Sequence, residues 1–348
     1  MPSTDTSLTQ AQARRALRHW SLPAAVDRIE PGSGTANASV LVDAGGHSFV
    51  LKRRNPRYAV EDWLAFDHAL MAHLRGRGIP VPLPLVARDG RTWLGMAGAI
   101  FELTAFLPGE EHRWGDAGQV RAAGEMLGRF HLAGADFHPP AEKRWERYHS
   151  PASIARDLQV VLSESGPVSA ARQEVMERAG SLARELLARL PDEAYHALPH
   201  AIVHGDWHPA NLKFRGTEVV GVFDLDWCTS QPRMVDLADG LLFFCGRRPE
   251  TIVPGDIWSL TQSFEMQARL VGASGQGYLG QIVPTPAELR ALPDLMRCRW
   301  LYCRVDAAVR KVDPGRRVEF ITRDLLGPLE WIDHNERALV DGSLLRAR

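Results

Sequence analysis

The stretch Ile202-Val-His-Gly-Asp-Trp-His-Pro-Ala-Asn-Leu-Lys-Phe214 places a polar loop between two short apolar segments. A second acidic cluster follows at Gly221-Val-Phe-Asp-Leu-Asp-Trp227, where an apolar run ends on two aspartates. Short runs rich in β-branched and aromatic residues, bounded by turn residues, are typical of strands. The pattern predicts short strands near Ala201 to Val203, Leu212 to Phe214 and Val219 to Phe223. The last of these strands leads directly into the two aspartates, Asp224 and Asp226.

Three oxygen-bearing side chains in this stretch have a spacing that indicates phosphoryl transfer. Asn211 lies five residues after Asp206, as in the H-R-D-L-x-x-x-N loop of protein kinases. Asp224 follows where those enzymes keep a metal-binding aspartate. The reaction needs a carboxylate that accepts the hydroxyl proton, and Mg²⁺ prefers hard oxygen ligands. We therefore predict that Asp206 is the catalytic base and that Asn211 and Asp224 bind Mg²⁺.

The composition excludes several other classes of protein. The chain has 348 residues, of which 45% are hydrophobic and 24% charged, values typical of a folded soluble protein. The formal net charge of -1 gives no reason to expect a nucleic-acid partner. No run approaches the roughly 18 apolar residues that a membrane span needs, and no signal peptide is apparent. We expect a cytoplasmic protein without a membrane partner, whose four cysteines are free thiols.

Upstream of Pro108 the pattern predicts a small antiparallel sheet with one helix inserted. A hairpin is indicated by Ser39 to Val42 and Ser48 to Lys52, which are joined by a glycine turn. Apolar residues at helical spacing predict a helix over Glu61 to Arg75. The other predicted elements are a first helix at Gln10 to Trp20, begun by a capping box at Thr9 and Gln12, and strands at Thr92 to Leu94 and Ala99 to Leu107.

Downstream of Glu111 the hydrophobic pattern of the sequence is mainly that of helices. The sequence therefore predicts an α+β fold, with a sheet-containing nucleotide-binding lobe at 1–108 and a mainly helical catalytic and acceptor-binding lobe at 109–348. The predicted helices are Gln119 to Ala133, one or two within Ile154 to Leu190, one from Met234, Leu292 to Val312, and Val318 to Leu339.

The motif His204-Gly-Asp-x-x-x-x-Asn211, followed by Asp224, resembles the aminoglycoside phosphotransferase and choline kinase-like superfamily. Within it the chain is similar to the bacterial branch with type II homoserine kinases, spore-coat CotS-like kinases and stress response kinases. The resemblance covers Gln10 to Gly240. It implies a bilobal protein-kinase-like fold and transfer of the γ-phosphate of ATP to a hydroxyl of a small molecule, with Mg²⁺ as cofactor. The segments that indicate the branch are Gly78-Ile-Pro-Val-Pro82, Phe106-Leu-Pro-Gly109 and Pro232-Arg-Met-Val-Asp-Leu-Ala238.

The resemblance also implies residues that bind the nucleotide. Lys52, at the end of an apolar strand, takes the place of the lysine that pairs with the α- and β-phosphates. The family normally holds this lysine with a glutamate on the following helix, and alignment places the shorter Asp67 there. Glu61 and Asp62 are alternative partners.

Other positions follow from the same resemblance. The turn that contains Gly32 and Gly34 would cover the phosphates, and the backbone near Leu103 and Ala105 would contact the adenine. Asp226 would either bind a second Mg²⁺ or cap the next turn. The family also implies that Asp236 holds the catalytic loop in place and that His204 is a packed, hydrogen-bonded residue. Trp207 and His208 are possible acceptor contacts.

Two alternatives to a small-molecule kinase stay open at this point. One is a protein serine/threonine kinase of the stress-response type, and the other is a nucleotide-binding pseudokinase that acts as a regulatory module. The residues expected near the acceptor carry both signs of charge, so the acceptor stays undetermined, as do the oligomeric state and the choice of ATP over GTP. These residues are Glu110, Glu111, Trp114, Arg297, Arg299, Arg304 and Asp306.

Overall fold

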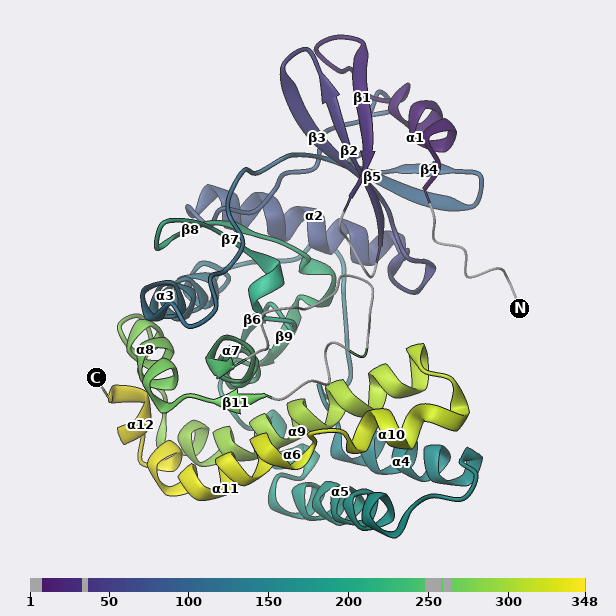
Figure 1. The fold of residues 1–348 in the computed structure, drawn as a ribbon. Helices are drawn as coiled ribbons and strands as arrows, with labels where there is room; N and C mark the ends of the chain where they lie inside the picture. Colours follow the sequence, from purple (N-terminus) through teal and green to yellow (C-terminus); the bar gives the residue numbers. More distant parts are fainter. Residues whose placement is uncertain (1–7, 33–36, 248–257, 259–263, 348) are drawn as a thin grey trace. The chain divides into compact units, whose positions relative to one another are not determined.

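The computed structural model describes residues 8–32, 37–247, 258 and 264–347 (Figure 1). Gly34, which was predicted to lie in the turn over the phosphates, falls outside the described residues. The chain folds into two compact units. The first unit contains Met1–Glu110, Asp136–Lys143 and Val220–Asp226, and the second contains Glu111–Ala135, Arg144–Val219 and Trp227–Arg348.

The first unit is built on the predicted antiparallel sheet, whose strand order is β1-β2-β3-β5-β4. The β2–β3 hairpin turns at Gly45 and Gly46, which both have positive φ, as a two-residue turn of this hand requires. The strands are β1 (Val26–Pro31), β2 (Ala38–Ala44), β3 (His47–Arg53), β4 (Leu94–Met96) and β5 (Ala99–Ala105).

Two helices belong to the same unit. The predicted capping box of Thr9 and Gln12 begins α1 (Gln10–Leu17), which ends three residues earlier than expected. Residues of α1 and Trp20 join a core cluster with apolar side chains of all five strands. Helix α2 (Glu61–Gly76) buries the expected apolar residues, and it also buries Asp67 and His68. Two polar side chains on a buried helical face need polar partners.

The second unit is mainly helical, as predicted, and its short strands match the three expected around the catalytic motif. The long segment 154–190 is two helices, and 318–339 is also divided in two. The helices are α3 (Ala117–Ala133), α4 (Pro151–Glu164), α5 (Ala170–Arg189), α6 (Asp192–His196), α7 (Met234–Cys245), α8 (Ala268–Leu279), α9 (Pro286–Lys311), α10 (Arg317–Thr322), α11 (Leu326–Val340) and α12 (Ser343–Arg346). The strands are β6 (His200–Val203), β7 (Leu212–Arg215), β9 (Thr229–Pro232), β10 (Gly246–Arg247) and β11 (Glu265–Met266). A further strand, β8 (Glu218–Val222), begins in this unit, and its residues from Val220 onward belong to the first unit.

Two of these helices anchor the second unit. Helix α7 is buried along its whole length, and it packs on α8 and α9. Helix α9 begins six residues before the predicted start, because Thr285 and Glu288 form a capping box there. Among the described residues, none of the helices combines the length and apolar character of a membrane span.

Glycines allow α3 and α8 to pack with their backbones close together. A Cβ atom on Gly277 of α8 would lie 2.0 Å from the carbonyl oxygen of Arg121 in α3. A Cβ atom on Gly124 of α3 would lie 2.1 Å from the carbonyl oxygen of Ser274 in α8. Backbone atoms on both sides mean that a larger residue can only be accommodated by moving a helix.

We therefore predict that Gly277→Ala lowers the free energy of unfolding by about 2 kcal/mol, as overpacking does. The control is Gly180→Ala in α5, where the nearest atom to a new Cβ is 3.6 Å away in the flexible Arg184 side chain. This change should raise stability by about 0.5 kcal/mol, because alanine favours a helix. Urea unfolding of both variants tests the packing, and equal stability of the two would contradict it.

Candidate active site

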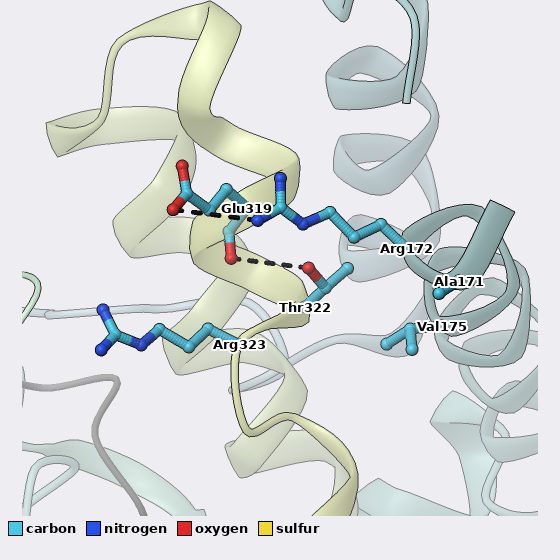
Figure 2. A pocket seen from close by; sticks show the side chains of 6 residues that line it. All are labelled: Ala171, Arg172, Val175, Glu319, Thr322 and Arg323. Atoms are coloured by element: carbon cyan, nitrogen blue, oxygen red, sulfur yellow. Dashed lines mark hydrogen bonds and ion pairs between the residues drawn. The ribbon is translucent and has the colours of Figure 1, made fainter. Parts of the chain in front are cut away.

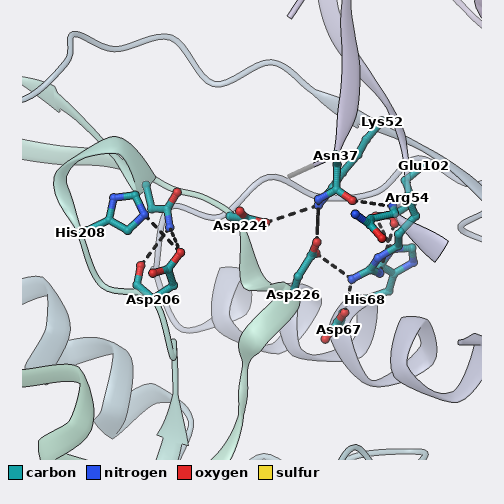
Figure 3. Close-up of polar contacts among 12 residues, drawn as sticks. Asn37, Lys52, Arg54, Asp67, His68, Glu102, Asp206, His208, Asp224 and Asp226 are labelled. Carbon is teal, nitrogen blue, oxygen red and sulfur yellow. Dashed lines mark hydrogen bonds and ion pairs between the residues drawn. The ribbon is translucent and has the colours of Figure 1, made fainter. Parts of the chain in front are cut away.

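Lys52 of β3 lies in a buried polar cluster of the first unit (Figure 3). Its Nζ is 2.9 Å and 3.0 Å from the two carboxylate oxygens of Asp226 and 3.6 Å from Oδ1 of Asp224. Burial alone would lower the pKa of Lys52, but Asp226 and Asp224 outweigh it and raise this pKa above its ordinary value. The lysine is therefore a fixed positive charge.

The strand geometry explains why several charges gather at this point. Alternate residues of an extended chain face the same side, so Lys52 of β3 and Arg54, the residue just after this strand, both reach the cluster. Glu102 of β5 is the register partner of Lys52. Its Oε1 is 3.2 Å from Nη1 of Arg54, and its Oε2 is 3.1 Å from Nε2 of His68. Burial raises the pKa of Glu102, but Arg54, His68 and Lys52 outweigh this effect and lower it to about 2.

The predicted pair of Lys52 and Asp67 is not formed. Asp67 lies on α2 as expected, but its Oδ2 is 2.5 Å from Nη2 of Arg54, and its Oδ1 is 2.5 Å from Nζ of Lys143. Lys143 also donates to the carbonyl oxygen of Asp226, at 2.8 Å. Asp67 thus forms ion pairs with Arg54 and Lys143, and Asp226 is the carboxylate that lies beside Lys52.

Asp226 is the centre of this cluster and is 2% exposed. Its Oδ1 accepts from Nη2 of Arg54 at 2.7 Å, and its Oδ2 accepts from Nδ2 of Asn37 at 2.8 Å, in addition to the contacts with Lys52. Burial raises the pKa of Asp226, but Lys52 and Arg54 lower it well below its ordinary value. Both oxygens of this carboxylate are engaged by donors of the protein itself.

Asp224 lies two residues after the end of β8 and has a φ of 61°. A left-handed backbone is strained for residues other than glycine, although aspartate tolerates it better than most. This conformation turns the chain between the strand and the buried Asp226. Its side chain is more exposed than that of Asp226, at 31% against 3%.

The structure also describes the other residues of the first unit that were predicted to contact the nucleotide, which are Gly32, Leu103 and Ala105. Gly32 follows β1 and donates its N–H to the carbonyl oxygen of Ser39, and a Cβ atom there would lie 2.2 Å from Oγ of Ser39. On β5 the Leu103 side chain is fully buried, and its carbonyl oxygen accepts from Leu85. Ala105 is exposed at the end of this strand. Ala105 therefore suits the predicted contact with a base better than Leu103 does.

In the second unit, Asp236 near the start of α7 holds the loop after β6. Its carboxylate accepts from the backbone N–H groups of His204 at 2.7 Å and Gly205 at 2.8 Å. Nε2 of His131 in α3 is 2.9 Å from the same carboxylate. The structural role expected for Asp236 is therefore confirmed, and His204 is fully buried, as expected. Gly205 itself has a φ of 79°, the left-handed conformation that glycine adopts freely.

Asp206, the predicted base, follows directly and has donors at both carboxylate oxygens. Nη2 of Arg299 lies 2.7 Å from Oδ1. Nε2 of His208 lies 3.2 Å from Oδ2 (Figure 3). Burial raises the pKa of Asp206, but His208 and Arg299 outweigh it and hold this pKa well below its ordinary value. The carboxylate is thus ionised and fixed in orientation, while 26% of the side chain remains exposed.

Asn211 ends a short 3-10 turn (Pro209–Asn211) and is tied to the same loop. Its Nδ2 donates to the backbone carbonyl oxygen of Asp206 at 2.9 Å. Since the nitrogen of the amide is used in this way, the oxygen is the end that can bind a metal ion. His208 caps the turn by accepting from Ala210.

Several residues of the site were not predicted. Arg54 could have been suspected, because it lies two residues after Lys52, just beyond the end of the same strand. No sequence pattern indicates the contacts of Asn37 and Lys143, or the contact of Arg299 with Asp206. Arg299 is one of several charged residues of a predicted helix, and it lies 93 positions from Asp206 in the sequence.

A surface pocket of the second unit lies elsewhere, between α5 and α10 (Figure 2). Its volume is about 340 Å³, and no predicted site residue lines it. The lining residues are Ala171, Arg172, Val175, Glu319, Thr322 and Arg323.

Comparison with known proteins identifies the family. The model of the phosphotransferase enzyme family matches residues 27–292. The homoserine kinase of Brucella anthropi is 29% identical over 270 residues, which cover 76% of this chain and 73% of that protein. The homoserine kinase of Acidiphilium cryptum is 27% identical over 297 residues, with coverage of 82% and 84%.

Solved structures show the same fold. A microcompartment-associated aminopropanol kinase has a TM-score of 0.70 at 16% identity and covers 95% of this chain and 99% of its own. An amicoumacin kinase in complex with AMP-PNP and Ca²⁺ has a TM-score of 0.65 at 16% identity, with coverage of 96% and 93%. The predicted α+β, protein-kinase-like fold is therefore confirmed.

The chain belongs to the phosphotransferase enzyme family. It is an ATP-dependent kinase that transfers phosphate to a hydroxyl group of a small molecule.

The lowered pKa of Glu102 gives a prediction for stability. A carboxylate whose pKa is lowered by folding stabilises the protein above its ordinary pKa of 4.5, and this contribution is lost as the pH falls toward about 2. At pH 7, Glu102→Gln should therefore lower the free energy of unfolding by about 3 kcal/mol. The difference from wild type should shrink as the pH falls below 4.5.

Urea unfolding of both proteins between pH 3 and pH 7 measures this difference. Glu30→Gln, which changes an exposed glutamate of β1 that pairs with Arg28, should cost less than about 1 kcal/mol at any pH. A difference for Glu102→Gln that stays constant with pH would show that the charge of Glu102 does not matter.

Proposed function

We propose that this enzyme phosphorylates the hydroxyl group of a small amino alcohol or hydroxy amino acid, using ATP with Mg²⁺. The observation that carries the proposal is the fixed carboxylate of Asp206, with a donor at each oxygen and part of its side chain exposed. The names of its relatives support the acceptor class, because homoserine and aminopropanol both combine a hydroxyl with an amine.

Asp206 acts as the base in this proposal. Its carboxylate orients the acceptor hydroxyl and takes the proton as the oxygen attacks the γ-phosphorus of ATP. Phosphoryl transfer passes through a loose transition state in most analyses, so positioning matters more than basic strength. A carboxylate with a low pKa suits this role, because it stays ionised and fixed by Arg299 and His208.

Lys52 is assigned to the α- and β-phosphates of ATP, and Asp226 is assigned to hold this lysine. The family's usual glutamate is replaced in this role by a residue from the acidic turn. Since both oxygens of Asp226 already receive donors, we assign it to Lys52 and Arg54 in preference to a metal ion.

Asp224 and the amide oxygen of Asn211 are assigned to Mg²⁺. Both provide the hard oxygen atoms that Mg²⁺ prefers. Among the described residues, no group of three or more His, Cys, Asp and Glu side chains could hold a metal by itself. This fits Mg²⁺ in kinases, which is bound by one or two carboxylates together with phosphate oxygens and water. When bound, the ion would neutralise charge that develops on the phosphates.

The set of Lys52, Asp206, Asn211 and Asp224 speaks against a pseudokinase, because a degenerate kinase usually loses at least one of these groups. We also propose that the enzyme works inside the cell, where ATP and reduced thiols are available. None of the four cysteines forms a disulfide bond in the structure.

We predict that the wild-type protein transfers phosphate from Mg²⁺-ATP to L-homoserine or 3-aminopropan-1-ol, and that Asp206→Asn lowers kcat by at least about 100-fold. Affinity for Mg²⁺-ATP should stay nearly unchanged. Release of ADP measures turnover, and ³¹P NMR identifies the product. Choline, kanamycin and a generic protein complete the panel of acceptors.

Asp89→Asn is a suitable control, since this exposed carboxylate contacts only its neighbour Arg91 among the described residues, and it should leave turnover intact. Transfer to kanamycin alone would reject the amino alcohol class. Binding of ATP without transfer to any acceptor would support a regulatory module.

A second prediction separates the two acidic residues of the turn. Asp224→Ala should weaken ATP binding in the presence of Mg²⁺, and a large excess of Mg²⁺ should restore part of it, because a metal ligand is lost. Asp226→Asn should weaken ATP binding in a manner that Mg²⁺ does not relieve, because Lys52 loses its partner. Titration calorimetry at several Mg²⁺ concentrations tests this. The same Mg²⁺ response in both variants would show that the roles are assigned wrongly.

A further inference from the structure

His149, just before α4, occupies an unusual place in the second unit. It is 7% exposed and has a φ of 52°. A left-handed backbone is uncommon outside glycine, although histidine adopts it more often than most residues, and such conformations cluster at functional sites. Its ring contacts Arg299, which in turn contacts the proposed base Asp206. His149 is therefore one side chain away from the reacting group.

The hydrogen bonding of His149 fixes the position of its proton. Nη1 of Arg299 lies 3.3 Å from Nε2 of His149, and a guanidinium group can only donate. Nε2 is therefore the acceptor. Burial lowers the pKa of His149 well below its ordinary value, and Arg299 and Arg147 lower it further, although Asp206 opposes them. The ring is neutral, so its proton lies on Nδ1.

Nδ1 of His149 is consequently a buried N–H donor, and it has no hydrogen-bond partner among the described residues. Leaving such a donor unpaired costs stability. Two arginines lie near the His149 ring, and both are paired with carboxylates. Arg299 binds Asp206 and Asp239, and Arg147 binds Asp192. Nε and Nη2 of Arg147 are also buried without a hydrogen bond in the described part of the chain. The unused N–H groups of His149 and Arg147 suit an anionic oxygen.

We propose that Nδ1–H of His149 binds the carboxylate group of the acceptor, so that the preferred substrate is a hydroxy acid. This inference rests on the proposed function and extends it to the part of the acceptor that does not react. Arg299 links the two ends of the site, with one nitrogen on Asp206 and another on His149. A short acceptor could then present its hydroxyl to Asp206 and its carboxylate to His149.

His112 shows why a buried histidine alone does not carry this argument. Its ring nitrogens are also without a hydrogen bond among the described residues. Its ring, however, packs against the rings of Trp114, Phe214 and Phe244, and the described part of the chain shows no contact of His112 with Arg299 or Asp206. His112→Phe is therefore a matched control, since it makes the same change at a buried histidine.

The test compares two acceptors that differ only in the carboxylate, L-homoserine and 3-aminopropan-1-ol. Wild type should prefer homoserine in kcat/KM by roughly tenfold or more, as expected for a hydrogen bond to a charged group. His149→Phe should raise KM for homoserine by about as much and leave KM for aminopropanol and for ATP within twofold. The preference between the two acceptors should therefore disappear.

His149→Asn provides the rescue variant, because asparagine tolerates the left-handed backbone and keeps an N–H donor. It should retain part of the preference for homoserine, and His112→Phe should retain all of it. A wild-type preference for aminopropanol would overturn the inference and leave the proposed function standing. Equal losses for both acceptors in His149→Phe would mean that His149 is only structural. Transfer to neither acceptor by wild type would overturn the proposed function as well.

Discussion

The buried carboxylate of Asp226 forms the interactions on which the polar cluster of the first unit depends. It receives Lys52 of β3, Arg54 just after this strand, and Asn37 just before β2. Taking these charges out of water is expensive, and removing one partner would leave the others uncompensated. The strand, the acidic turn and helix α2, through Asp67 and Lys143, are therefore fixed as a group. Lys52 and Asp224 derive their positions from this group.

The second unit uses the same principle with a different arrangement. Asp236 gathers two backbone N–H groups of the catalytic loop and His131 of α3, and this fixes the loop on the buried helix α7. Asp206 then stands on a rigid support, and Arg299 and His208 orient its carboxylate. The proposed base Asp206, held in this way, needs little reorganisation when the acceptor arrives, which favours a reaction governed by positioning.

Much of this arrangement was predictable because it depends on local patterns. The order of strands and helices follows from hydrophobic periodicity and turn residues, as in the hairpin at Gly45 and Gly46. The spacing of Asp206, Asn211 and Asp224 reflects one loop and one turn, so the sequence contains it directly. The capping boxes at Thr9 and Thr285 mark two helix starts, although only the first was recognised.

The sequence by itself determined the fold class and the kind of chemistry, because both are encoded by residues that are close together along the chain. Only the tertiary structure decided which charges pair. Asp67 was expected to hold Lys52, yet it binds Arg54 and Lys143, while Asp226, 174 positions away, holds the lysine. Arg299 and His149, 150 positions apart, meet beside Asp206. Ion pairs act over a few ångströms in space, and the packing that brings distant residues so close leaves no local pattern in the sequence.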